Sequence, residues 1–353
     1  MEMNQQIKGR GAQHQLDNKF SNTSLTLEHI EGVDEFTPYE SAKTEIFYEY
    51  PKEIVNKVKS PDVGMAYSLN PYQGCEHGCV YCYARITHEF WGYNAGLDFE
   101  SKIIVKKNAA RLLEKTILKP SWKVNPIVLS GNTDCYQPIE QKLRITRSLL
   151  KVFADYRHPV SIITKNVGFL SDLDLLEDLA KDNLVRVILS ITSLDEAIRS
   201  KLEPRTATAK KKLEAIKVLS GKGIPVSIMT APIIPGLNDQ EIPAIIEAAA
   251  AHGAIDAAYT VVRLNGAVKD VFQKWLKINF PDRYQKVWHQ IESLHGGKVN
   301  DSNFGKRMGG QGQEADMIKQ LFDLAKRKFM DGGRKIHLNT KAFRRGGNYS
   351  LFY

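Results

Sequence analysis

The chain has 353 residues and a net charge of +9 at pH 7, and its composition (42% hydrophobic, 25% charged) is ordinary for a globular protein with a substantial core. No apolar run approaches the ~20 residues that a membrane helix requires, and the opening residues lack the apolar segment of a secretory signal; we therefore expect a cytoplasmic protein with no membrane partner. The four cysteines of such a chain argue against a disulfide scaffold, and the clustering of three of them favours a metal site.

The first 40 residues are polar and poorly periodic, so they predict an N-terminal arm rather than a domain. From about residue 60, short apolar runs alternate with amphipathic stretches, as in successive βα units. The predicted strands are 64–69, 126–130, 160–164, 185–191, 225–231 and 258–264. The predicted helices between them are 107–118, 139–156, 172–180, 208–219 and 239–252, with Ser171 as a helix N-cap and Gly221 and Gly223 as a helix stop.

Helical connections between strands imply a parallel sheet in an α/β fold. Six such units fit either a doubly wound sheet or a curved, incomplete barrel, and the pattern alone leaves both open. After residue 268 the strand pattern ends, and helices are predicted at 271–276, 284–294 and 314–330. We therefore expect three parts: an arm (1–40), an α/β core (41–268) and a helical, basic C-terminal extension (269–353).

The positive charge is concentrated near the end of the chain. Residues 296–353 contain 12 Lys and Arg against 5 Asp and Glu, which gives +7 of the total +9. A basic segment of this kind indicates a polyanionic partner such as nucleic acid, or else a surface that only keeps the protein in solution. Charge alone leaves both interpretations open.

Three cysteines, Cys75, Cys79 and Cys82, lie within eight residues after the first predicted strand. Gly74 and Gly78 permit tight backbone turns, so a closely folded loop can direct three thiolates at one point. Thiolates bind zinc, copper(I) and iron–sulfur clusters.

The number of cysteines in this group separates the metal alternatives. A structural zinc site uses four ligands, usually as two separated pairs, so zinc would need Cys135 or His77 as a fourth donor. A four-iron cluster with only three cysteine ligands instead leaves one iron open to a further ligand. Three ordinary buried thiols are the remaining interpretation.

The spacing Cys-x3-Cys-x2-Cys, with Tyr81 just before the third cysteine, resembles the signature of the radical S-adenosylmethionine (SAM) superfamily. The resemblance implies a 4Fe-4S cluster on Cys75, Cys79 and Cys82 whose open iron chelates SAM. It also implies reductive cleavage of SAM to a 5′-deoxyadenosyl radical, which removes a hydrogen atom from a substrate. The family fold is a partial (β/α)6 barrel, Tyr81 would lie against the adenine, and a flavodoxin or ferredoxin would act as the reductant.

Active sites of such barrels lie at the C-terminal ends of the strands, so the residues after each predicted strand are candidates for SAM contacts. By the resemblance, the backbone of Ser130, Gly131 and Asn132 would receive the SAM amino group, although the stretch also fits a simple turn. Lys165 would contact a substrate anion or the SAM carboxylate, or it is a solvated loop lysine. Residues 232–239 would approach the adenine through their backbone, or they form a stiff connecting loop.

After the fourth strand, Ser190 and Thr192 resemble the ribose contacts of the family. Arg205 would pair with the SAM carboxylate, which suits a guanidinium, and Glu203 would accept a hydrogen bond from a SAM hydroxyl or amino group. The alternative for all four residues is an ordinary polar loop. The sixth strand contributes two further polar residues to the same mouth, Arg263 and Asn265.

Several segments together resemble one branch of the superfamily, grouped with spore photoproduct lyase and described as DNA-repair-photolyase-like. These segments are 8–11, 68–72, 133–138, 202–205 and 232–239. In the lyase, hydrogen abstraction splits a thymine dimer and a cysteine returns a hydrogen atom. Cys135 follows a predicted strand at the expected barrel mouth, so it is a candidate catalytic hydrogen donor, with a spectator thiol or an additional cluster ligand as alternatives.

The leading hypothesis is therefore a lyase-like radical SAM enzyme that acts on a nucleic-acid lesion. A second hypothesis keeps the radical SAM chemistry but assigns a protein or a small molecule as the substrate. A third is a zinc-stabilised nucleic-acid-binding module with no catalytic activity, which the basic C-terminal segment would serve equally well.

Overall fold

The computed structural model describes residues 7–20, 43–331 and 336–347. Its six parallel strands follow one another in chain order across a seven-stranded sheet, β10-β9-β8-β7-β6-β3-β2, with β2 pairing antiparallel to β3 at the edge. The strands are β2 (Val55–Lys57), β3 (Tyr67–Leu69), β6 (Ile127–Leu129), β7 (Val160–Thr164), β8 (Val185–Ser190), β9 (Val226–Ile233) and β10 (Asp256–Val261). All six predicted strands are thus present.

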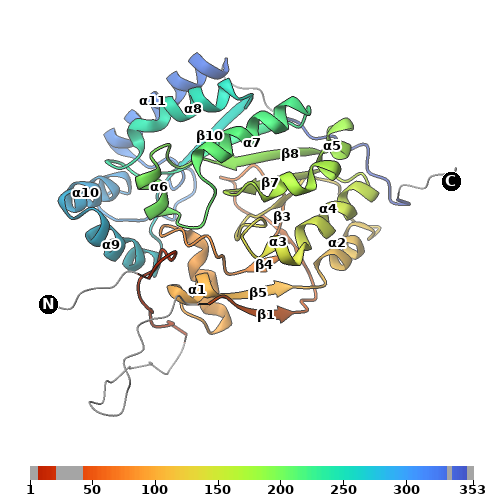
Figure 1. Cartoon of the computed structure of the whole chain (residues 1–353), viewed down its shortest axis with the longest axis horizontal. Helices are drawn as coiled ribbons and strands as arrows, with labels where there is room; N and C mark the ends of the chain where they lie inside the picture. The colour runs from red at the N-terminus through yellow and green to blue at the C-terminus, as the bar shows by residue number, and fades with distance from the viewer. Residues whose placement is uncertain (1–6, 21–42, 332–335, 348–353) are drawn as a thin grey trace, which may run out of the picture.

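Amphipathic helices carry the chain back between these strands and cover the outside of the sheet (Figure 1). They are α2 (Ala109–Ile117), α4 (Ile145–Asp155), α5 (Leu173–Lys181), α6 (Glu196–Leu202), α7 (Ala209–Gly221) and α8 (Ile242–Ala251). Apart from α6, whose Ile198 and Leu202 pack in a second cluster, the apolar faces of these helices and the strands form the main core. Phe153, Leu176 and Ile216 are fully buried in it. Helical crossovers of this kind keep the outer face of a parallel sheet out of contact with water.

Three boundary predictions were wrong for identifiable reasons. The predicted helix 139–156 is interrupted at Arg144, whose φ of +55° ends α3 (Glu140–Leu143) before α4 begins. Ser171 does not cap α5, because its hydroxyl bonds to the carbonyl of Gly168 within a 3-10 turn (Gly168–Asp172). Helix α7 continues through Gly221, and the left-handed residue that follows its end is Gly223.

A second, three-stranded sheet has no counterpart in the predicted elements. It has the order β1-β5-β4, formed by β1 (Glu45–Glu49), β4 (Tyr72–Gln73) and β5 (Lys102–Lys106), and α1 (Leu97–Ser101) directly precedes β5. The 3-10 helix Tyr83–Trp91 lies between β4 and α1.

The C-terminal region is helical, as predicted. It contains α9 (Val268–Asn279), α10 (Tyr284–Leu294) and α11 (Gly312–Met330), with a short 3-10 turn at Pro281–Arg283 between the first two. Another short 3-10 turn, Asp239–Glu241, lies earlier in the chain, between β9 and α8. Within the described ranges, every helix is too short or too polar to span a lipid bilayer. The predicted division at residues 40 and 268 stays a prediction.

Part of the predicted arm lies against the core. Residues 1–6 and 21–40 of the arm, and 332–335 and 348–353 of the extension, lie outside the described residues. Gly11 packs so closely on the Gly78 carbonyl that a Cβ at Gly11 would lie 1.8 Å from that oxygen. The segment around Gly11 therefore packs directly on the cysteine-containing loop.

Candidate functional site

The three clustered cysteines lie on a loop, residues 74–82, that follows β4; we call it the cysteine loop. Gly74 and Gly78 adopt φ values of +81° and +69°, which side-chain-bearing residues rarely adopt. A Cβ at Gly78 would also lie 2.9 Å from Glu100 Oε2. Both predicted turns are therefore present, and both require glycine.

The cysteine thiols are neighbours in a poorly hydrated site. Cys75 and Cys79 are buried, and Cys82 is partly buried and packs against the two apolar clusters that contain them. Burial raises the pKa of all three thiols, and the neighbouring cysteines raise those of Cys75 and Cys79 further. Such thiols give up their protons when a cationic centre binds them, because the positive charge offsets the cost of burying three thiolates.

The donor set fits a three-cysteine cluster better than a single zinc ion. Across the described residues, no three His, Cys, Asp or Glu side chains form a group arranged to hold one metal ion. Zinc needs four donors at about 2.0–2.3 Å, whereas a four-iron cluster is bound by more widely spaced sulfurs. Both ring nitrogens of the proposed fourth donor His77 already have partners: Nδ1 lies 3.4 Å from Asp134 Oδ2, and Nε2 lies 3.4 Å from the side-chain nitrogen of Asn166.

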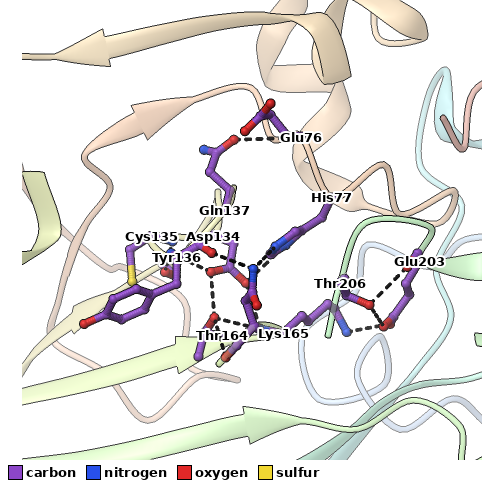
Figure 2. A network of polar contacts seen from close by, with 12 residues as sticks. Glu76, His77, Asp134, Cys135, Tyr136, Gln137, Thr164, Lys165, Glu203 and Thr206 are labelled. Atoms are coloured by element: carbon purple, nitrogen blue, oxygen red, sulfur yellow. Dashed lines mark hydrogen bonds and ion pairs between the residues drawn. The ribbon is translucent and has the colours of Figure 1, made fainter. Parts of the chain in front are cut away.

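Gln137 fixes the backbone on both sides of Cys75. Its side-chain oxygen accepts from the N–H of Glu76 (2.9 Å), and its side-chain nitrogen donates to the carbonyl of Gly74 (3.2 Å), as part of the network in Figure 2. Arg85 donates twice to the carbonyl of Cys79, at 3.0 and 2.9 Å. The cysteine loop is therefore held by side chains as well as by its own turns.

A buried ion pair lies beneath the cysteine loop. Arg85 and Glu100 are both fully buried and 2.5 Å apart. The two Glu100 carboxylate oxygens also accept from the backbone N–H groups of Gly11 (3.0 Å) and Ala12 (2.8 Å). We call these four residues the Glu100 cluster; it joins the N-terminal segment to the loop.

A second buried carboxylate, Glu203, lies on the other side of the loop. Its oxygens pair with Lys165 (3.0 Å) and Lys212 (3.5 Å), and they accept from the hydroxyls of Tyr81 and Thr192. Burial alone would raise the pKa of Glu203, but the two lysines and the hydroxyls hold it far below its usual value. We call these five residues the Glu203 cluster.

The Glu203 cluster brings together four of the predicted SAM contacts: Tyr81, Lys165, Thr192 and Glu203. Lys165 donates to Glu203, to the Thr192 hydroxyl (3.2 Å) and to the carbonyl of Ala231 (3.0 Å). An ammonium has three N–H donors, so a contact with a SAM carboxylate or a substrate anion would replace one of these bonds. The four predicted contacts stay predictions, with their side chains now placed side by side.

Ser130, Gly131 and Asn132 lie on a different side of the cysteine loop. Ser130 has a φ of +70° and accepts from the N–H of Cys135 (2.7 Å). The Gly131 carbonyl accepts from the hydroxyl of Tyr83, the residue after Cys82. The predicted stretch is therefore at the cysteine loop, although much of its backbone is already used in holding the turn.

Ser190 and Arg205 are separated from the Glu203 cluster. Ser190 is the last residue of β8 and is buried. The Arg205 guanidinium pairs with Glu76 at 3.3 Å, and its side chain is 32% exposed. Arg205 therefore keeps N–H donors that face solvent, which its predicted pairing with a carboxylate needs.

The Cys135 side chain lies in the main core and does not face the barrel mouth, and its role as a hydrogen donor stays a prediction. Its side chain is fully buried in the main core and, in Figure 2, points away from Glu76 and His77. The turn at Ser130 reverses the loop, and the Cys135 carbonyl then accepts from the Thr146 hydroxyl of α4 (2.7 Å). A hydrogen donor must reach the substrate, so this position favours the spectator thiol among the alternatives.

Asp134 is a positioning residue that the sequence analysis did not single out. It accepts from the Thr164 hydroxyl (2.8 Å) and from the N–H of Lys165 (2.7 Å), and so connects the end of β7 to His77. Burial lowers the pKa of His77, which is therefore neutral near pH 7. Asp134 and Gln137 both fall in the stretch 133–138 that carried the branch resemblance, whereas nothing in the sequence distinguished Lys212 from the other lysines of α7.

Comparison with known proteins identifies the family. Residues 69–249, just over half of the chain, match the model of the radical SAM superfamily. An uncharacterized protein of Mycobacterium tuberculosis is 31% identical over 245 residues, which cover 68% of this chain and 72% of that protein. An uncharacterized protein of Methanocaldococcus jannaschii is 31% identical over 247 residues, which cover 70% and 88%.

Solved structures of spore photoproduct lyase share the fold. The lyase complexed with dinucleoside spore photoproduct matches with a TM-score of 0.61 at 17% identity, over 86% of both chains. A double mutant of the lyase with bound SAM and the dinucleoside matches with a TM-score of 0.61, over 89% of this chain and 88% of the lyase. The likeness confirms the predicted α/β partial-barrel fold with its helical C-terminal region. The family match and the fold together show that the chain belongs to the radical SAM superfamily, as an enzyme of SAM radical chemistry.

Proposed function

We propose that this enzyme binds a 4Fe-4S cluster through Cys75, Cys79 and Cys82 and uses it to cleave SAM to a 5′-deoxyadenosyl radical. The observation that supports the proposal is the set of three neighbouring free thiols on one fixed loop. When bound, the cluster supplies the electron for the cleavage. A flavodoxin or ferredoxin is the proposed source of that electron.

The residues of this chain have separate tasks in the proposal. Gln137 and Arg85 fix the backbone at Cys75 and Cys79, so the thiols keep their mutual orientation. The Glu203 cluster contains two lysines for one carboxylate, which leaves a net positive charge beside the loop. This excess of positive charge favours binding of the SAM carboxylate, and the solvent-facing N–H donors of Arg205 favour that binding further.

For the substrate, we propose a nucleic-acid lesion and a lyase-like reaction. The lyase with the shared fold is seen in complex with a dinucleoside photoproduct. A shared fold does not establish a shared substrate, but the +9 charge of this chain independently favours a polyanion. The hydrogen donor of that reaction is left unassigned, since Cys135 lies in the core.

The test is a comparison of Cys79→Ala with Cys135→Ala, both reconstituted with iron and sulfide without oxygen. Wild type should contain about four irons per chain and release 5′-deoxyadenosine from SAM under reduction. Cys79→Ala should lose both the iron and the product, whereas Cys135→Ala should retain its iron. A colourless wild-type protein with one zinc per chain would instead establish the binding module.

A further inference from the structure

Arg263 is a partly buried arginine at the barrel mouth that lacks an ion-pair partner. It follows the C-terminal end of β10, and within the described ranges it makes no hydrogen bond or ion pair. The nearby Asp62 is already occupied by the N–H of Gly305 (2.8 Å) and by Arg307 (2.5 Å). Burial and the positive charge of Arg307 both lower the pKa of Arg263, while Tyr83 and Asp62 raise it. Asp62 is the counter-charge of both arginines, so an anion bound here would supply a second one.

The segment 299–308, which we call the bridge segment, brings Arg307 to this place. Both ends of the segment bond beside β10: the N–H of Leu264 donates to the Val299 carbonyl (3.0 Å), and the N–H of Val261 donates to the Met308 carbonyl (2.9 Å). On the other side, Arg307 bonds to Asp62, which lies in the loop after β2. Because β10 and β2 are the two edges of the seven-stranded sheet, the bridge segment crosses the opening between them.

Two exposed aromatic rings flank the arginines. Tyr83, which follows Cys82, is 46% exposed and is a neighbour of Arg263. Phe304 in the bridge segment is 59% exposed, and the Arg307 guanidinium lies 4.5 Å from the centre of its ring. Exposed aromatic rings interleaved with arginines are typical of surfaces on which single-stranded nucleic acids stack their bases and place their phosphates.

We propose that Tyr83, Arg263, Phe304 and Arg307 form the binding surface for a single-stranded nucleic acid, with a backbone phosphate on Arg263 and bases on the two rings. The proposal rests on the proposed function and narrows its substrate class from nucleic acid to a single strand. Because Tyr83 is adjacent to a cluster cysteine, a base stacked on it would lie beside the cysteine loop. The strand would thus reach the site through the opening that the bridge segment crosses.

The experiment measures binding of a fluorescein-labelled 12-nucleotide oligothymidylate to the reconstituted full-length chain, by anisotropy at several salt concentrations. Arg263→Gln should weaken binding about tenfold and reduce the slope of log K against log salt by about 0.7, the value for one phosphate contact on a single strand. Phe304→Ala should weaken binding by about fivefold to tenfold through lost stacking. Phe304 is exposed, so this variant should fold even if a change at Arg263 disturbs the protein.

The matched control is Arg111→Gln, which removes the same charge from an exposed position on the outer helix α2 and should bind like wild type. If wild type binds the oligonucleotide and neither Arg263→Gln nor Phe304→Ala weakens the binding, the proposed binding surface is wrong. The proposed function would be unaffected by that result. Equal affinity for a duplex of the same length would overturn the single-strand assignment. If wild type binds neither the single strand nor the duplex at low salt, the proposed nucleic-acid substrate is also wrong. Release of 5′-deoxyadenosine still tests separately whether the enzyme binds the cluster and cleaves SAM.

Discussion

The cysteine loop lies between two buried carboxylates that are neutralised in different ways. Glu100 pairs with Arg85 and accepts from two backbone N–H groups, and the charge of Arg10 also acts on it. Glu203 faces two lysines, one of them 18% exposed, and two hydroxyls from residues predicted to contact SAM. The Glu100 cluster has no net charge, whereas the Glu203 cluster has an excess of one positive charge.

This difference separates a structural role from a functional one. A charge-balanced, fully buried ion pair attracts no further ion. Removing one of its two charges lowers the free energy of unfolding. A cluster with a partly exposed cation and surplus positive charge can still attract an anionic group. We therefore expect substitutions at Glu100 to act mainly on folding and substitutions at Glu203 to act on both folding and SAM.

The largest expected effect is that of Glu100→Gln. The change leaves the Arg85 guanidinium buried without its counter-charge, which costs about 3–5 kcal/mol of the free energy of unfolding. Denaturant titration of the apoprotein measures this cost without interference from the cluster. A loss of less than about 1 kcal/mol of the free energy of unfolding would show that water reaches the Arg85–Glu100 pair in solution. The proposed difference between Glu100 and Glu203 would then not hold.

Glu203→Gln should cost less, about 2–3 kcal/mol, because Lys165 is partly exposed and water can solvate its charge when the carboxylate is removed. The folded-state pKa of Glu203 lies below the unfolded value of 4.5. Its contribution is therefore complete above about pH 4.5 and is lost as the pH falls further. The stability difference between wild type and Glu203→Gln should be constant from pH 5 to about 7 and shrink in acid.

The same variant should also weaken SAM binding by about tenfold, since Tyr81, Thr192 and Lys165 lose their common partner. Equilibrium dialysis of the reconstituted protein with labelled SAM measures this effect. Glu100→Gln serves as the comparison, tested in the fraction that still folds. Equal losses of SAM affinity in the two variants would contradict the division between a structural and a functional carboxylate.

Gly11→Ala tests how far the Glu100 cluster depends on the N-terminal segment. The added Cβ would lie 1.8 Å from the Gly78 carbonyl, so the backbone must move and the bonds to Glu100 lengthen. We expect a cost of about 1–3 kcal/mol and faster bleaching of the cluster in air. Gly64→Ala is the control, because a Cβ there meets nothing within 4 Å; similar behaviour of the two variants would show that the segment detaches in solution.

Cys135→Ala should have the smallest effect and calibrates the others. Cys135 is buried but has no charged partner, so the change removes only one sulfur atom from the main core. We expect a loss of about 1 kcal/mol, measured by the same denaturant titration. A loss of iron from this variant would show instead that Cys135 takes part in the metal site.

The parts of the fold that were predictable are those with local signals. The six parallel strands and most helices have a clear periodicity, and the three cysteines form a motif within one short loop. The break at Arg144 was invisible, because the apolar spacing continues across it and only its left-handed φ ends the helix. The position of Cys135 was not predictable for a similar reason. The loop before it reverses direction at Ser130, which has a positive φ, and serine residues rarely adopt this conformation.

The two carboxylate clusters were not predictable as clusters. Glu100 pairs with Arg85 and with the backbone of Gly11, and Glu203 with Lys165, all of them distant in the sequence. Such pairs depend on how the fold places distant segments, and they produce no periodic pattern in the sequence. The resemblance to a family supplied Glu203 and Lys165 as individual residues, and the structure shows that they bind each other.

The backbone bonds of the cysteine loop have a consequence for how the enzyme is made. The N–H of Val80 donates to the Leu202 carbonyl, and the His77 carbonyl accepts from the N–H of Arg205. A ribosome must therefore synthesise the chain beyond Arg205 before the loop can take its final shape. We expect iron and sulfide to be delivered after translation of the barrel, to a scaffold that is already largely formed, so that maturation in the cell would depend on carrier proteins able to reach a recessed loop.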